Sequence, residues 1–406
     1  MKRAAMLTHW VHLLVSTLCT ATLSVGQQPL VALGRDDVRA ASAIAALQQW
    51  YNKDSGLWDT TGWWNGANVL TMLADFSAVD DSFDHAIRNV FENTFVQAQL
   101  QASNFVKIMS PKSVDTYTRE ARAPGNRTRH LTGFTGFLNE YYDDEGWWAL
   151  AWLKVYDLTK QERYLQMAIE IFEDMTTGWG GKCGGLWWNK EHTYTGAIEN
   201  ALFLTVAAQL ANRAANEEYY IQWALKQWEW FQQTGMINAQ YNINNGIDPI
   251  TCRNDGGTIW TYNQGVILGA LVELNEAAPD DSYLDTAEKI ALAALEKLSD
   301  SNGILHEPCE PECGADGPQF KGIFIRNLRI LQHAQPDDRL KAFVERNADS
   351  IWHHDRGSGQ HLGLLWSGPF TEATASTQSS ACDALVAALS VQGRSKSYGP
   401  VSQLVA

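Results

Sequence analysis

The chain has 406 residues, 45% of them hydrophobic, which is enough to bury a large core and permits one large domain or several smaller ones. Its formal net charge of −15 disfavours binding to nucleic acid and to anionic lipid, and it is compatible with a neutral ligand. The 17 tryptophans are more informative, because indole rings stack well on the apolar faces of sugars, although many of them will fill the core.

The first 26 residues have the layout of a secretory signal. Lys2 and Arg3 form a basic start, an apolar run covers about 10–23, and small residues follow at 24–26. The apolar run is too short to anchor the chain in a bilayer, and the polar segment 395–406 lacks the features of a lipid-anchor signal. We therefore expect a signal peptide at 1–26 and a secreted, extracellular protein without a membrane anchor.

Two kinds of helix alternate along the rest of the chain. Six apolar segments start with aromatic, Gly, Asn or acidic residues, and their anchor positions are 65, 145, 199, 263, 321 and 380. Amphipathic patterns with apolar residues three and four apart fill the intervals, at 36–51, 82–101, 161–175, 217–233, 282–298 and 337–352. Several of these patterns begin with cap-like residues such as Asp36 and Ser82.

Six helix pairs, in which the apolar member always comes second, predict an all-α fold, an (α/α)6 toroid of six inner and six outer helices. No Pro/Ser-rich linker divides the mature chain, so we expect a single catalytic domain at 27–406. In such a ring the loops before the inner helices gather at one end. The longest cover 102–143, 176–198, 234–262 and 299–320, and they predict one groove floored by the starts of the inner helices.

The cysteines predict disulfide bonds, as secretion favours. The short loop between Cys309 and Cys313 is the best candidate for a bridge, and Cys183 with Cys252 is the next. Cys382 lies in an apolar helical stretch and is expected to be a buried free thiol.

Other motifs give weaker signals. His306 with the nearby Cys309 pair lacks a fourth ligand for zinc. The Gly-rich segment 178–185 follows no long strand, which argues against a phosphate-binding loop. The sequon at 126–128 fits a glycosylated surface loop. We expect no metal and no cofactor.

The pair Asp143-Asp144 is the strongest candidate for catalysis. It is flanked by aromatic residues and is the one acidic pair that opens an apolar inner helix. At a first helical turn both side chains can reach one cleft, with carboxyl groups about 5 Å apart, the spacing of a retaining glycosidase. Two close carboxylates cannot ionise equally, so one can serve as the acid and the other as the nucleophile. The structural alternative is that Asp143 caps the helix while its neighbours favour the helix dipole, because acidic first turns are common.

The acidic pair belongs to the longer motif Y-Y-D-D-E-G-W-W-A-L-A-W at 141–152. Further motifs lie at 63–68, 183–188, 199–204, 260–265 and 320–326. In this order they resemble the glycoside hydrolase family 76 endo-α-1,6-mannanases, and the stretch 141–152 is similar to the catalytic segment of that family. The resemblance implies an (α/α)6 fold and cleavage of α-1,6-linked mannan with retention. It also implies that Asp143 is the nucleophile and Asp144 the general acid/base.

Other candidates for substrate contact lie near the starts of inner helices or in the long loops. They are Asn68, Trp147, Asn200, Asp248, Tyr262, Asn263 and Lys321. Each polar one could instead cap a helix or bind a loop backbone, and an Asx-turn is the structural alternative for Asp248. Trp187, Trp188 and Trp260 could also offer stacking surfaces, although core packing is the commoner fate of a single Trp.

The expected partner is a polysaccharide, α-mannan, and we expect a monomer. A close rival is a cell-wall transglycosidase, since some fungal members of the resembled family are thought to transfer mannose-containing anchors to wall glucan. Those members usually carry a C-terminal lipid-anchor signal. The sequence also leaves open a carbohydrate-binding toroid without turnover and a helical scaffold for protein partners. Neither of these two would need both Asp143 and Asp144 in an aromatic setting.

Overall fold

The computed structural model describes residues 35–109, 114–118 and 135–392. The chain divides into two units, residues 1–35 and 36–406, and everything below concerns the second. The predicted signal segment and the sequon at 126–128 lie outside the described residues.

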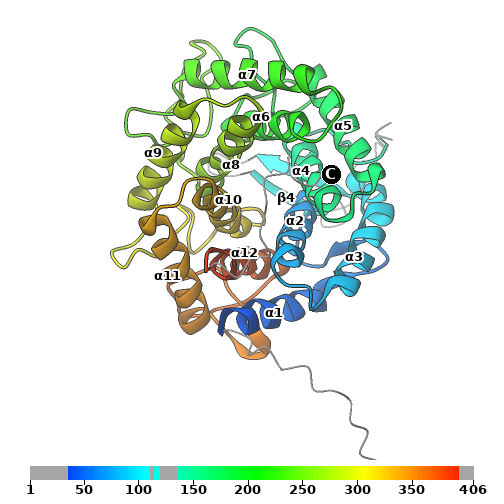
Figure 1. Ribbon diagram of the computed structural model, residues 1–406, viewed down its shortest axis with the longest axis vertical. Coiled ribbons are helices and arrows are strands. Elements are labelled where there is room, and N and C mark those ends of the chain that lie inside the picture. The colour runs from blue at the N-terminus through cyan, green and yellow to red at the C-terminus, as the bar shows by residue number, and fades with distance from the viewer. Residues whose placement is uncertain (1–34, 110–113, 119–134, 393–406) are drawn as a thin grey trace, which may run out of the picture. The chain divides into compact units, whose positions relative to one another are not determined.

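Six apolar helices form the inner layer. They are α2 (Trp63–Val79), α4 (Tyr142–Thr159), α6 (Ala197–Ala211), α8 (Thr261–Ala277), α10 (Phe320–Ala334) and α12 (Ala375–Val391). Each packs against the next, and α12 packs against α2, so the ring is closed (Figure 1). Every residue of α6 is buried, as expected for a helix that is apolar on all sides. The predicted inner layer is confirmed.

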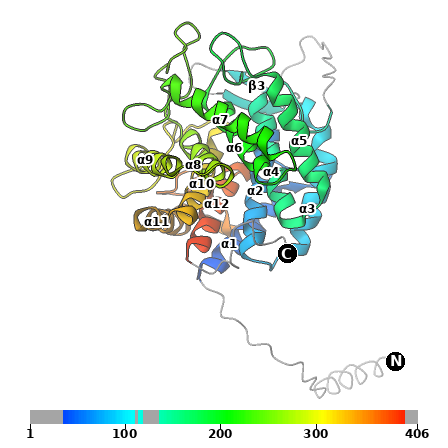
Figure 2. The ribbon, with the colours of Figure 1, turned by 45° about the horizontal axis from the view of Figure 1, so that its top comes forward.

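Six amphipathic helices lie outside this ring (Figures 1 and 2). They are α1 (Arg35–Leu47), α3 (Asp84–Gln97), α5 (Glu162–Thr177), α7 (Glu217–Thr234), α9 (Asp281–Lys297) and α11 (Asp338–His354). In α5 the buried residues Tyr164, Leu165, Ala168, Ile171, Phe172 and Met175 make one helical stripe. Within the described residues the alternation of outer and inner helices confirms the predicted (α/α)6 toroid.

Two of the expected helix caps are wrong. Ser82 does not cap α3, because its own amide donates to Asp80 Oδ1 in a turn and the helix begins at Asp84. Asp36 lies inside the first turn of α1, where it accepts hydrogen bonds from Arg39 and Gln392. Asp36 follows the acidic preference of helix starts, and Asp84 takes that place in α3.

The loops before the inner helices are joined to one another around the ring. The Tyr142 amide at the start of α4 donates to Trp188 O in the loop before α6, at 3.0 Å. The Ala197 amide at the start of α6 donates to Asn245 O in the loop before α8, at 2.7 Å. Thr261 at the start of α8 donates in turn to Glu307, before α10. These bonds hold the inner-helix starts and their loops together at one end.

A repeated amide contact fixes each loop to its own helix. Asn200 in α6 accepts from Leu186 N and donates to Leu186 O. Gln264 in α8 does the same with Ile243 N and O. Gln378 in α12 accepts from Leu362 N in the same manner. All three amides are fully buried, so the contact satisfies loop backbone groups that water cannot reach.

Strands are few and short. β1 (Tyr51–Asn52) pairs with β2 (Leu57–Trp58), and β3 (Phe105–Met109) pairs antiparallel with β4 (Val114–Thr118). β4 is seen within the ring of inner helices (Figure 1). The β3–β4 hairpin belongs to the long segment 102–143, for which the sequence predicts a loop only, so that prediction is incomplete. The β3–β4 pair matters for the site because β3 contains Lys107.

The predicted disulfide pairings are confirmed. Cys183 is bonded to Cys252 and Cys309 to Cys313, while Cys382 is a buried free thiol. The first bond joins the loop before α6 to the loop before α8. Among the described helices, none combines the length and the apolar character that crossing a bilayer requires.

Candidate active site

The first turn of α4 holds the acidic pair. Tyr141 precedes the helix in an extended conformation, and Asp143 and Asp144 follow, 7% and 3% exposed. The amides of a first helical turn have no partners within the helix, and the helix dipole favours negative charge there. The start of α4 therefore stabilises a carboxylate.

Asp143 is surrounded by hydrogen-bond donors. Its Oδ2 accepts from Lys107 Nζ at 2.7 Å and from Trp188 Nε1 at 3.0 Å. Its Oδ1 accepts from the Asp144 amide at 2.9 Å. All three partners donate to this one carboxyl group.

Asp144 is in a different environment. Its Oδ2 accepts from Asn139 Nδ2 at 2.8 Å, and Lys107 Nζ lies 2.5 Å from its Oδ1. Burial raises the pKa of Asp144 to about 6, the charge of Lys107 opposes this rise, and the neighbouring Asp143 adds to it. Asp144 is therefore poised to hold and release a proton near neutral pH.

The two contacts of Lys107 limit the distance between the nearest oxygens of Asp143 and Asp144. Lys107 Nζ lies 2.7 Å from Asp143 Oδ2 and 2.5 Å from Asp144 Oδ1, so these two oxygens are at most 5.2 Å apart. Carboxyl groups of retaining glycosidases are about 5–5.5 Å apart, whereas inverting enzymes keep them about 6.5–9.5 Å apart. The upper limit on this oxygen–oxygen distance is compatible with the spacing of a retaining enzyme.

Lys107 reaches the pair from β3, where it lies opposite Thr116 of β4. Its side chain is 4% exposed, and its Nζ lies 5.0 Å from the ring centroid of Tyr141 and 5.6 Å from that of Trp188. Burial alone would lower the pKa of Lys107, but the charges of Asp143 and Asp144 raise it above its usual value. Lys107 is therefore a buried ammonium ion.

Two further buried acids, Glu145 and Glu199, bind backbone amides that precede the inner helices. Glu145 accepts from the Asn139 amide at 2.9 Å and from Lys190 Nζ at 2.8 Å, and burial raises its pKa well above the usual value. Glu199 accepts from the Gly196 amide, and burial raises its pKa to about 8 although that hydrogen bond opposes the rise. Both are tied to backbone groups that position the first turns of α4 and α6.

Tyr262, at the start of α8, is a predicted substrate residue whose hydroxyl is affected by the charge of Asp143. It is half-buried and stacks on Phe320 with 3.9 Å between ring centroids and 7° between planes. Burial raises the pKa of Tyr262 well above its usual value, and the charge of Asp143 is the next cause. Trp147 is buried and stacks on Trp64, with centroids 5.5 Å apart, so it supports the site from within the core.

Asn200 and Asn263 have structural partners. The oxygen of Asn200 accepts from the Leu186 amide and Gln227, and its nitrogen donates to two loop carbonyls. The amide has two donor hydrogens and two acceptor lone pairs, all in use, so it binds loop backbone instead of a sugar. Asn263 is fully buried and donates to Asn245 at 3.2 Å.

Asn68 and Lys321 also lie inside the ring. Asn68 is 1% exposed and accepts from Arg326. Lys321 is fully buried, pairs with Glu310 and donates to Leu364 O at 2.6 Å. The structure gives both side chains partners within the protein, which favours the structural alternative.

Asp248 forms the Asx-turn that was its structural alternative. Its Oδ1 accepts from the Ile250 amide at 3.0 Å and from the amide and hydroxyl of Thr251, at 2.7 Å and 3.0 Å. These bonds with Thr251 and Ile250 lower the pKa of Asp248. The carboxylate therefore shapes the loop that ends at Cys252.

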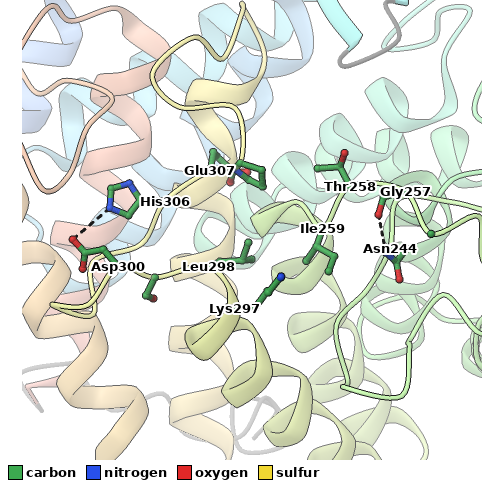
Figure 3. Close-up of a pocket in the computed structure, with 12 residues that line it drawn as sticks. Asn244, Gly257, Thr258, Ile259, Lys297, Leu298, Asp300, His306 and Glu307 are labelled. Carbon is green, nitrogen blue, oxygen red and sulfur yellow. Dashed lines mark hydrogen bonds and ion pairs between the residues drawn. The ribbon is translucent and has the colours of Figure 1, made fainter.

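A separate hollow of about 480 Å³ lies between the loops before α8 and α10 (Figure 3). Lys297, Leu298 and Ile259 line it, and His306 turns toward Asp300, with 3.5 Å between Nε2 and Oδ2. His306 also contacts Glu310 at 2.6 Å. Its described lining includes no Trp, Tyr or Phe side chain, and it includes neither Asp143 nor Asp144. Among the described residues no group of three or more His, Cys, Asp or Glu side chains could hold a metal ion.

Sequence reasoning missed Lys107 and Asn139, and assigned Trp188 only to stacking. Lys107 gave no signal, because a single Lys in a long loop is usually exposed. Asn139 lies four residues before Asp143, and a helix-start motif could have drawn attention to it. The donors to the acidic pair are visible only once the segments 105–109, 139–144 and 186–188 come together.

Comparison with known proteins now identifies the family. The model of glycosyl hydrolase family 76 matches residues 37–400. The chain belongs to glycosyl hydrolase family 76. It is therefore a glycoside hydrolase.

Individual relatives agree with this assignment. The chain is 24% identical over 366 residues to mannan endo-1,6-α-mannosidase DFG5 of Candida albicans, covering 83% of this chain and 75% of that protein. The fold matches the α-1,6-mannanase GH76A of Salegentibacter sp. HEL1_6 with a TM-score of 0.71 and 22% identity, over 86% of this chain and 98% of that chain. An inactive variant of the same mannanase, with two consecutive aspartates replaced by asparagine, was solved with α-1,6-mannotriose. It matches with a TM-score of 0.70 and 22% identity, over 87% of this chain and 99% of that one.

Proposed function

We propose that the protein is a secreted, endo-acting α-1,6-mannanase that works with retention of configuration. Asp143 is the nucleophile and Asp144 the general acid/base. One observation carries this proposal: the two carboxylates share one buried lysine and are at most 5.2 Å apart, yet their hydrogen-bond environments differ. A pair with one charged and one protonated member is what a double displacement requires.

In the first half of the reaction, a carboxylate oxygen of Asp143 bonds to the anomeric carbon. The glycosidic C–O bond breaks, and its oxygen takes the proton from Asp144. In the second half, water attacks the anomeric carbon and gives a proton to Asp144, while the bond to Asp143 breaks and its carboxylate is restored. Tyr262, half-buried and affected by the charge of Asp143, is proposed to contact the bound sugar.

The substrate class is supported by the relatives. The Candida albicans protein is a mannan endo-1,6-α-mannosidase, and the Salegentibacter variant with two consecutive aspartates replaced is inactive and binds α-1,6-mannotriose. This chain has two consecutive aspartates in the first turn of α4. Secretion is supported by the signal-like segment 1–26 and by the two disulfides. Amino-terminal sequencing of protein recovered from the culture medium tests the signal, and it should begin near Gln27.

Linear α-1,6-mannan with a labelled end tests the reaction. Wild-type protein should release reducing ends and shorten the chains at internal positions, and the newly formed ends should have the α configuration by NMR. Binding without release would support a carbohydrate-binding toroid. Products longer than the input, formed with an acceptor present, would support a transglycosidase. Either result, like products of β configuration, would overturn part of the proposal.

Azide separates the two aspartate roles. Asp143→Ala with an activated α-mannosyl substrate should give β-mannosyl azide, because azide attacks from the face of the missing nucleophile. Asp144→Ala should give the α-azide, because azide replaces water at the covalent intermediate. The reverse assignment of products would exchange the roles.

A further inference from the structure

The ammonium of Lys107 lies between the two acids, in a cage of opposite charge and aromatic rings. It is within 2.7 Å of both carboxylates, and its side chain is 4% exposed. The faces of Tyr141 and Trp188 lie 5.0 Å and 5.6 Å from it and favour a cation at this point. Removing such a cation would leave two buried acids side by side without compensation.

In the proposed reaction the acidic pair keeps the same net charge, which one fixed positive charge can balance. Before the first step, Asp143 is ionised and Asp144 protonated, so the pair carries one negative charge. In the covalent intermediate, Asp143 is a neutral ester and Asp144 is ionised, so the pair again carries one negative charge. The charge has moved from one carboxyl group to the other, and Lys107 contacts an oxygen of each.

We propose that Lys107 is the positioning residue of this reaction, a counter-ion that balances the single negative charge of the acidic pair in both halves of the catalytic cycle. This inference rests on the proposed function. The β3–β4 hairpin is then a part of the active site, because it delivers the lysine. A lysine suits the task better than an arginine fork would, since a point charge need not hold either carboxylate in a fixed two-bond geometry.

The pH dependence follows from the sign of this charge. Lys107 opposes the rise that burial causes in the pKa of Asp144, so its loss should raise that pKa further. The basic limb of activity needs protonated Asp144, so that limb should move to higher pH. Four other ionisable groups interact electrostatically with Lys107 or Asp143, and the test leaves all of them in place. They are Tyr141, Glu199, Tyr262 and Asp316.

The test compares Lys107→Met, Lys107→Gln and Lys107→Arg with wild type over the pH range. The two neutral variants should lose roughly 100-fold in kcat and shift the optimum upward by about one pH unit or more. Lys107→Arg should keep a profile close to wild type and recover part of the rate. Lys160→Met is the matched control, because it removes one exposed lysine at the other end of α4 and should change neither profile nor rate.

A lysine that merely blocks the site would behave differently. Lys107→Met would then be more active with an unshifted optimum, which would overturn the inference, as would a profile in either neutral variant that matches wild type. A direct measurement needs no substrate: carboxyl carbon NMR should show the Asp144 resonance titrating at higher pH in a neutral variant than in wild type, with Asp144→Asn giving the assignment. An inactive wild type on mannan would sink the proposed function alone, whereas unchanged titration in the neutral variants would sink the counter-ion alone.

Discussion

A cluster of two acids and one cation lies at each end of helix α4. The two clusters differ in how the cation affects the pKa of its acids. At the start of α4, Lys107 lies between Asp143 and Asp144. At its end, Arg213 lies between Asp157 of α4 and Glu273 of α8, with contacts of 2.9 Å to each.

The two cations differ in how completely they satisfy their acids. The Arg213 guanidinium donates three hydrogen bonds to Asp157, two of them shared by Nε, and two to Glu273. Although burial raises the pKa of Glu273, Arg213 more than offsets this and lowers it below the usual value. At the other end, burial outweighs Lys107 and raises the pKa of Asp144 to about 6. The guanidinium, with five hydrogen bonds, makes a structural tie between helices, whereas a point charge leaves one acid able to exchange a proton.

The largest effect should come from the acids at the start of α4. Asp143→Asn and Asp144→Asn keep the side-chain shape and should each lower kcat/KM on α-1,6-mannan by roughly 10³-fold or more, because each removes an essential charge or proton. Initial rates with circular dichroism as the folding control measure this. Near-wild-type activity in either variant would refute the pair assignment.

Changing the cluster at the end of α4 should lower the free energy of unfolding and leave the activity unchanged. Arg213→Met leaves two largely buried carboxylates without their cation and should cost about 3 kcal/mol of unfolding free energy, while the activity of the folded fraction stays unchanged. Chemical denaturation measures the cost. Arg213→Lys keeps the charge without the fork and should lose less. A loss of activity greater than the loss of folded protein would contradict the separation of roles.

The pH profile should show the same contrast. Asp144 must be protonated in the free enzyme, so kcat/KM should fall about tenfold per pH unit as pH rises through about 6. Its stability effect has the same direction: a raised pKa in the folded state favours folding at low pH, and this contribution is lost as pH rises through about 6. Glu273, with its lowered pKa, favours folding at higher pH, and its contribution is lost on acidification. Asp144→Asn should remove the first dependence and leave the second.

The smallest expected effects on activity distinguish two residues that the sequence predicted to contact the substrate. Tyr262→Phe should raise KM for mannan by about tenfold through the loss of one hydrogen bond to sugar. Asp248→Asn should change kcat/KM less than twofold, because its carboxylate serves the turn at 248–251. Equal effects would show that the Asx-turn does not exhaust the role of Asp248.

Most of the architecture could be read from the sequence because helix periodicity is local. The outer helix predicted at 217–233 is Glu217–Thr234 in the structure, and the anchors at 145 and 199 each lie in the first turn of an inner helix. The cysteine pairs also followed from spacing and compartment. These signals need no knowledge of distant contacts.

The composition of the site could not be read in the same way. Asp143 and Asp144 are adjacent in sequence, so their pairing is local, but Lys107 lies 36 residues from Asp143 and Trp188 lies 45 away. Asn200 shows the converse difficulty, because the sequence alone does not reveal the loop backbone groups that its buried amide binds. Polar residues acquire their roles from tertiary contacts that no periodicity encodes.

Trapping the covalent intermediate tests the central claim most directly. A fluorinated α-mannosyl fluoride, which forms the glycosyl-enzyme readily and releases it slowly, should add one sugar mass to the intact protein. Peptide mapping should place that sugar on Asp143, with no adduct in Asp143→Asn. Turnover without any adduct, or an adduct on a residue outside the first turn of α4, would contradict a double displacement carried by this pair.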